Sequence, residues 1–296
     1  MDHRRDPSGA DSHSALSINE EFNFTGPHGV SDDTAKVRLS GAAISTGSPA
    51  VTLASAGTTG VWAPENTREA IFDAIRSKQT YGTSGTFIRL RFFGGWDYSK
   101  NLVKDKDFVE KAYKTGVPMG GDLPMKPDSA KAPTFAVWAM KDPESGNLDR
   151  VQIVKGWQAA GHGHEQIYDV VWADTDKRKP DPKTGKLPPV GNTVDIKKCT
   201  WENTIGDTQL SAVWTDPHFD PSQHAVYYVR VLEIPTPRWS TYDAKTLGID
   251  PPTGYPATQQ ERAWSSPIWY TPDPTIAAKA KYDAVVHGAA SQNKKK

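Results

Sequence analysis

The sequence predicts an α+β fold that is mainly a mostly antiparallel, β-sandwich-like domain, and three observations support this prediction. From residue 133 onward, short β-type segments are separated by Asp-Pro, Pro-Pro and Gly-Asn turn signals. A helical period is almost absent from that part of the chain, which is typical of a sandwich. Ten tryptophans are many for 296 residues and favour strands around an aromatic core.

The composition excludes several classes of protein. The 35 basic and 35 acidic residues cancel, which argues against a generally basic nucleic-acid binder. A single cysteine, Cys199, excludes an internal disulfide framework and a cysteine-rich metal site. No apolar run approaches the ~18 residues of a membrane-spanning helix, and the first residues lack the apolar stretch of a signal peptide.

The first predicted element is a helix at about 66–78. Asn66 and Glu69 have the spacing of a capping box, and an apolar stripe follows at positions 70, 71, 74 and 75, with Phe72 beside it. Because this helix is amphipathic, we expect it to cover an apolar surface, most simply a sheet. The Gly/Ala/Ser/Thr-rich stretch before it, residues 41–60, reads as a long connection.

The remaining elements are mainly strands. In the strand that follows the helix, Ile88, Leu90 and Phe92 share one face, and Arg89 and Arg91 point to the other. A short helix is expected at 105–114, with Tyr113 on its apolar side. The expected strands lie at about 86–93, 134–140, 148–157, 166–173, 210–215 and 225–234, with a closing aromatic segment at 263–270.

The most suggestive chemical cluster is Asp11-Ser12-His13. A carboxylate and an imidazole two residues apart can reach one divalent metal ion, and this donor pair suits zinc, manganese or iron. Two ligands do not make a catalytic site, so a solvated terminus is the alternative interpretation.

Four other features have a structural and a functional interpretation. The segment 162–165, His-Gly-His-Glu, has metal-like spacing but also fits a polar hairpin loop. Cys199 beside two lysines fits inert packing better than a reactive thiol. Arg89 and Arg91 could hold an anionic substrate or form a solvated face. The aromatic segment 263–270 fits core packing better than a ligand platform.

Longer segments resemble a known family, the bacterial domain of unknown function 3604 family, over about residues 9–273. The segments that carry the resemblance are TREAIFDAIR (67–76), TYGTSG (80–85), RFFGGW (91–96), PMGGDLP (118–124), KDPESGNLDR (141–150), PPVGNTV (188–194), YVRVLEIPTPRW (228–239) and QERAWSSPIWY (260–270).

The resemblance implies a relation to the polymerase-and-histidinol-phosphatase metallo-hydrolases, which have a distorted α/β barrel and a cluster of divalent metals. Their late metal motif is Asp-x-His, so the resemblance implies that Asp11 and His13 are metal ligands. Glu21 and His28 are implied as residues that support those ligands. Phe22, Thr25 and Pro27 depart from the family pattern in this region.

The helix and its Gly-Thr-Ser-Gly turn are then expected to border the substrate. On that basis Arg68, Thr83 and Ser84 are candidates for residues that approach it.

The family's first metal ligands lie on a His-x-His strand, and nothing of that kind precedes Asp11. We therefore expect the chain to be a C-terminal portion, which a missing N-terminal portion would complete. The expected organisation is a barrel remnant with linker and helix at 1–85, the sandwich-like domain at 86–273 and a Lys/Ala-rich tail at 274–296. A truncation, a frameshift and a misplaced start are not distinguished.

Two functions follow as hypotheses. The first is a metal-dependent phosphoesterase, in which manganese, zinc or iron activates water against a small-molecule phosphate ester, and which is catalytically incomplete as this chain. The second is a non-catalytic β-sandwich interaction or binding module. The substrate, the native metal, the oligomeric state and the compartment stay open, and a periplasmic or secreted full-length relative fits as well as any other.

Overall fold

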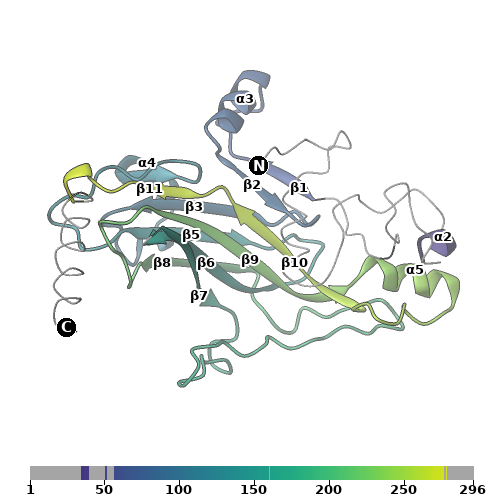
Figure 1. The fold of residues 1–296 in the computed structure, drawn as a ribbon. Coiled ribbons are helices and arrows are strands. Elements are labelled where there is room, and N and C mark those ends of the chain that lie inside the picture. The colour runs from purple at the N-terminus through teal and green to yellow at the C-terminus, as the bar shows by residue number, and fades with distance from the viewer. Residues whose placement is uncertain (1–34, 40–50, 52–56, 160, 277, 279–296) are drawn as a thin grey trace.

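The computed structural model describes residues 35–39, 51, 57–159, 161–276 and 278, and in these residues two sheets pack face to face (Figure 1). All strand pairs within the sheets are antiparallel. The larger sheet has the order β1 (Thr58–Val61), β2 (Thr80–Thr83), β10 (Thr258–Ser265), β9 (Ala225–Pro237), β6 (Leu148–Ala159), β7 (His162–Trp172), with β11 (Ile268–Tyr270) also paired to β9. The smaller sheet has the order β4 (Gly116–Pro118), β3 (Arg89–Gly95), β5 (Thr134–Met140), β8 (Gln209–Thr215).

The core lies between the sheets and is built by alternating residues of the central strands. Ile88, Leu90 and Phe92 are buried there, which confirms the predicted face of the first strand. The Phe135 ring lies 5.5 Å from the Phe92 ring in the same sheet and 4.4 Å from the Tyr227 ring in the opposite sheet, measured between ring centroids. These aromatic contacts join the two sheets, so the sandwich-like part of the predicted fold is confirmed.

A second, smaller apolar cluster covers the outer face of the smaller sheet. Helix α4 (Phe108–Thr115) and the 3₁₀ turn η2 (Leu102–Lys104) pack there against Phe93. The Tyr98 hydroxyl donates to the carbonyl of Ala112 at 2.8 Å, which ties the helix to the sheet. The opposite face of β3 is therefore not uniformly solvated, because Phe93 alternates with the two arginines.

Helices α2 and α5 were not expected from the sequence. Helix α5 (Trp239–Leu247) follows β9 directly and ends at Gly248, which adopts the left-handed conformation (φ 67°) that glycine accepts at a helix end. Helix α2 (Ala35–Leu39) lies against α5, where the Arg38 guanidinium forms a two-nitrogen ion pair with Asp243 at 2.6 Å. This pair joins segments more than 200 residues apart.

Helix α3 (Arg68–Arg76) projects from the sheets at the top of Figure 1. Its N-cap is Thr67, whose hydroxyl accepts from the Ala70 amide at 3.3 Å, so the predicted capping pair of Asn66 and Glu69 is one residue out of register. The small Ala74 is buried against the body of the protein, whereas Phe72 and Ile75 are 61% and 53% exposed. The expectation that the bulky stripe of this helix covers a sheet was therefore wrong.

The residues before position 85 join the same sheet as those after it. Strands β1 and β2 pair with each other, and β2 pairs with β10. The barrel remnant expected at 1–85 is therefore not part of what the structure shows, since residues 1–34 and 40–50 lie outside the described residues. The division into segments ending at 85 and 273 stays a prediction.

Candidate functional site

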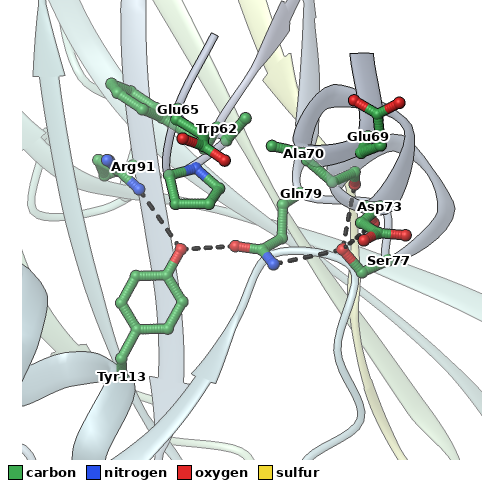
Figure 2. Close-up of a pocket in the computed structure, with 12 residues that line it drawn as sticks. Trp62, Glu65, Glu69, Ala70, Asp73, Ser77, Gln79, Arg91 and Tyr113 are labelled. Atoms are coloured by element: carbon green, nitrogen blue, oxygen red, sulfur yellow. Dashed lines mark hydrogen bonds between the residues drawn. The ribbon is translucent and has the colours of Figure 1, made fainter. Parts of the chain in front are cut away.

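A groove with a volume of about 730 Å³ and a mixed polar and apolar lining lies between α3 and the edge of the smaller sheet (Figure 2). One wall is formed by α3, and the other by Arg91 on β3, Tyr113 on α4 and Trp62 just after β1. Gln79, directly before β2, lies between them (Figure 2). The groove is lined by Trp62, Ala63, Pro64, Glu65, Glu69, Ala70, Asp73, Ala74, Ser77, Gln79, Arg91 and Tyr113.

The central cation of the groove is Arg91. Its guanidinium carbon lies 3.3 Å from the centroid of the Trp62 ring, so the planar group stacks on the indole. The indole N–H of Trp62 donates to the Leu90 carbonyl at 2.7 Å, which fixes the ring on the strand that carries Arg91. Burial lowers the pKa of the Arg91 guanidinium from its ordinary value, and the neighbouring Tyr113 hydroxyl opposes this shift.

A chain of hydrogen bonds crosses the floor of the groove (Figure 2). The Tyr113 hydroxyl accepts from Arg91 Nη1 at 3.5 Å and donates to Gln79 Oε1 at 2.5 Å. The Gln79 amide then donates to the Ser77 hydroxyl at 3.2 Å, and Ser77 donates to the Asp73 carbonyl at 2.8 Å. These hydrogen bonds connect Tyr113 of α4 to the residues at the C-terminal end of α3.

The α3 wall is acidic. Glu69 and Asp73 are one helical turn apart and line the groove, and Glu65 lies at its rim beside Trp62 (Figure 2). In the part of the chain that the structure describes, no ion pair joins any of these carboxylates to Arg91 or to another cation. Arg91 and the carboxylates thus lie on different walls of the groove, and Glu69 and Asp73 also border the outer side of α3 with Phe72 and Ile75.

The metal-ligand candidates cannot be placed in this geometry. Asp11 and His13, and the supporting residues Glu21 and His28, lie outside the described residues. Within the described ranges, no group of three or more His, Cys, Asp or Glu side chains is arranged to hold a metal ion. The metal site therefore stays a prediction.

The three residues expected near the substrate lie in two different places. Arg68 is exposed at the start of α3, on the outer side of the helix with Phe72. Thr83 is buried and its hydroxyl lies 2.6 Å from that of Thr58 on β1. Ser84 hydrogen-bonds Glu261 and accepts from the Arg262 amide at 2.8 Å. None of them lines the groove, and their approach to a substrate stays a prediction.

The other sequence candidates are structural in the described part of the chain. Residues 162–165 are exposed on the β6–β7 hairpin, where His164 stacks on Trp157 at 5.3 Å between centroids. Cys199 is buried, and burial raises the pKa of its thiol. In the closing aromatic segment, Ala263, Ile268 and Tyr270 belong to the core, whereas Trp264 is half-buried and Trp269 is exposed, so the expected core packing holds for only part of the segment.

The sequence alone identified one groove residue, Arg91, as a candidate for holding an anion. Trp62 and Gln79 were missed because they lie in short connections without a periodic pattern. Tyr113 was assigned to an apolar helix face, and its ring does contact Phe93 at 5.0 Å, while its hydroxyl enters the groove. The sequence signal that pointed to Arg91 was the pair Arg89 and Arg91 on a strand with an otherwise apolar sequence.

Together the two packed sheets and the groove define a β-sandwich protein with an arginine- and tryptophan-lined polar site. A family model described as "Protein of unknown function (DUF3604)" matches residues 8–272, and the chain belongs to that family. The comparisons with curated proteins and with solved structures gave no match. Among the described residues, no helix is long and apolar enough to cross a membrane.

Proposed function

We propose that the described part of this protein is a binding module whose groove takes a small ligand with an anionic group. The observation that carries this proposal is the Arg91 guanidinium, which is held against Trp62 and Tyr113 at the edge of a groove of about 730 Å³. No carboxylate of the described residues pairs with it.

The geometry favours recognition of a carboxylate or a phosphate. A guanidinium presents five N–H donors in a planar fork, and stacking on Trp62 occupies its face but leaves its edge available. Tyr113 occupies one nitrogen, Nη1, so donors remain for the two oxygens of a bidentate anion. Partial burial strengthens this interaction, because less water competes for the charge.

Arg91→Gln is expected to remove anion binding by the groove. Losing a charge-assisted bidentate contact costs roughly 1.5–3 kcal/mol, which corresponds to about 10- to 100-fold in affinity. Isothermal titration calorimetry with inorganic phosphate and with hexanoate measures this effect. The matched control is Arg89→Gln, since Arg89 lies two residues away on the same strand, is exposed and does not line the groove. Equal affinities in the two variants would contradict the proposal.

We propose as a second candidate the metal-dependent phosphoesterase that the family resemblance implies. It is favoured by the Asp11-Ser12-His13 triplet, which lies inside the range that the family model matches. One carboxylate and one imidazole suit zinc, manganese or iron, and such a metal would activate water for hydrolysis. Two ligands do not complete a hydrolytic cluster, so full activity needs further ligands from another portion or chain.

Metal uptake tests this second candidate. We expect the purified chain to bind manganese or zinc, and we expect Asp11→Ala and His13→Ala each to abolish the binding, because each removes one of the two proposed ligands. Equilibrium dialysis followed by elemental analysis measures the bound metal. His224→Ala is the matched control, since this exposed histidine lies directly before β9 and outside both segments with metal-like spacing. Binding that survives both substitutions, or no uptake at all, would count against this candidate.

A further inference from the structure

The hydrogen bonds on the floor of the groove run in one direction, from Arg91 toward α3 (Figure 2). A guanidinium can only donate, so the Tyr113 hydroxyl accepts from Arg91 Nη1. At the other end, the single proton of the Ser77 hydroxyl goes to the backbone carbonyl of Asp73 at 2.8 Å, so Ser77 accepts from Gln79. The Gln79 amide therefore turns its nitrogen toward Ser77 and its oxygen toward Tyr113.

This direction leaves one acceptor position beside Arg91. A phenolic hydroxyl has one proton and two lone pairs. The proton of Tyr113 is donated to Gln79 Oε1 at 2.5 Å, and one lone pair accepts from Arg91 Nη1 at 3.5 Å. The second lone pair has no partner among the residues that the structure describes. Because Tyr113 is 40% exposed and lines the groove, this lone pair is open to a ligand that Arg91 holds.

The network also keeps Tyr113 an acceptor toward the groove. If its hydroxyl turned the proton to a ligand, the bond to Gln79 would break and two oxygens would face each other without a proton between them. A flipped Gln79 amide would lose the bond to Ser77, whose proton is already donated to α3. Each rearrangement gives up a hydrogen bond, so the direction that the structure shows is the favoured one.

We propose that Tyr113 selects an anion that carries a hydroxyl proton of its own, which makes a singly protonated phosphoryl group the ligand of the groove. This inference rests on the anion site proposed above and narrows its ligand from a carboxylate or a phosphate to a phosphate. The charged oxygens of such a group accept from the edge of Arg91, and its hydroxyl donates to Tyr113. An ionised carboxylate or sulfonate offers no donor, so its contact with the lone pair of Tyr113 is repulsive.

The test compares two probes of similar shape, methylphosphonate and methanesulfonate, by isothermal titration calorimetry. At a pH at which methylphosphonate keeps one proton, both probes carry a single negative charge and the phosphonate alone has a hydroxyl. We expect methylphosphonate to bind about fivefold more tightly, which is the effect of one ordinary hydrogen bond. Tyr113→Phe should abolish this preference and leave the affinity for methanesulfonate equal or higher. The variant keeps the ring that contacts Phe93, and circular dichroism checks that it folds.

The outcomes separate this inference from the proposed function. Equal affinities of the two probes for the wild-type protein would exclude selection by Tyr113 while the anion site stands. If neither probe binds, the anion site fails and the inference fails with it. Tyr242→Phe on α5 is the matched control and should keep the preference, because this tyrosine is 41% exposed and does not line the groove. An equal loss of affinity for both probes in Tyr113→Phe, or a lost preference in the control, would overturn the inference.

Discussion

Asp216→Ala is expected to lower the free energy of unfolding by about 3–5 kcal/mol, because it leaves a buried lysine without its counter-ion. Lys155 lies on the core side of β6 and is 4% exposed, and its Nζ is 2.6 Å from Asp216 Oδ2. The same oxygen accepts from the Tyr227 hydroxyl at 2.7 Å. The Lys155 ammonium also donates to the His218 carbonyl at 2.7 Å, which alone does not compensate a buried charge.

Urea denaturation followed by tryptophan fluorescence measures this loss. Asp128→Ala is the control, since Asp128 is exposed and forms no side-chain hydrogen bond or ion pair with the residues that the structure describes, and its substitution should change stability by less than about 0.5 kcal/mol. The double variant Lys155→Met/Asp216→Ala should recover part of the loss, because it removes both buried charges. If Asp216→Ala were no more destabilising than Asp128→Ala, the ion pair would not be essential to the fold.

The second large effect is a loss of stability on raising the pH, and we expect Glu233→Gln to reduce it. Glu233 on β9 is fully buried, one of its oxygens accepts from Ser145, and the other has no hydrogen-bond partner among the described residues. Burial raises the pKa of this carboxyl from 4.5 to about 8, and the nearby carboxylates of Glu261 and Asp142 add to the shift while the hydroxyls of Ser145 and Thr86 oppose it. The group is therefore protonated in the folded protein at neutral pH.

The sign follows from the protons bound in each state. Between about pH 4.5 and 8 the Glu233 carboxyl holds a proton in the folded state that it releases in the unfolded state. Its contribution to the free energy of unfolding is therefore full below pH 4.5 and declines as the pH rises to 8. At about 1.4 kcal/mol per pH unit, the wild type should lose on the order of 3–5 kcal/mol across this window. Glutamine keeps the shape of the neutral acid and does not ionise, so the variant should be the more stable form at alkaline pH.

Urea denaturation at a series of pH values from 4.5 to 9 measures this dependence for the wild type and for Glu233→Gln. The pKa of Glu261 is also raised by burial, so a weaker slope of the same sign should remain in the variant. Glu144→Gln is the control, because Glu144 is an exposed carboxylate close to Ser145 in the chain. An unchanged slope in Glu233→Gln would mean that the buried carboxyl is not the origin of the effect.

Much of the β-structure could be predicted from local patterns. The strand at 134–140 was predicted with the bounds that the structure gives to β5, and its neighbours β6, β8 and β9 differ by a few residues at their ends. These strands could be predicted because they pack on a single core, and this packing imposes a regular alternation of apolar residues on their sequences. Strands β1 and β2 were missed, since each has only four residues, rich in Thr and Gly. Strand β1 is held by pairing with β2, and β2 is held by pairing with β10, far along the chain.

Helix α3 marks the limit of this approach for the candidate site. The helical spacing of its apolar residues predicted a helix at about 66–78, and the structure has this helix at Arg68–Arg76. A helical period in the sequence separates the faces of a helix, but it does not say which face packs against the rest of the protein. In α3 the small Ala70 and Ala74 face the groove, whereas Phe72 and Ile75 face outward. The orientation depends on where β1 and β2 join the sheet, which is set by residues nearly 200 positions later in the chain.

By itself, therefore, the sequence determined the sandwich-like fold class, the main strands and the family, because alternation and long specific segments are local properties of the chain. Only the tertiary structure decided that Trp62, Gln79, Arg91 and Tyr113 meet in one groove and that this groove faces the acidic side of α3. These residues come from four separate segments. Their convergence is a consequence of strand pairing and helix packing, and neither leaves a mark on the spacing of residues along the chain.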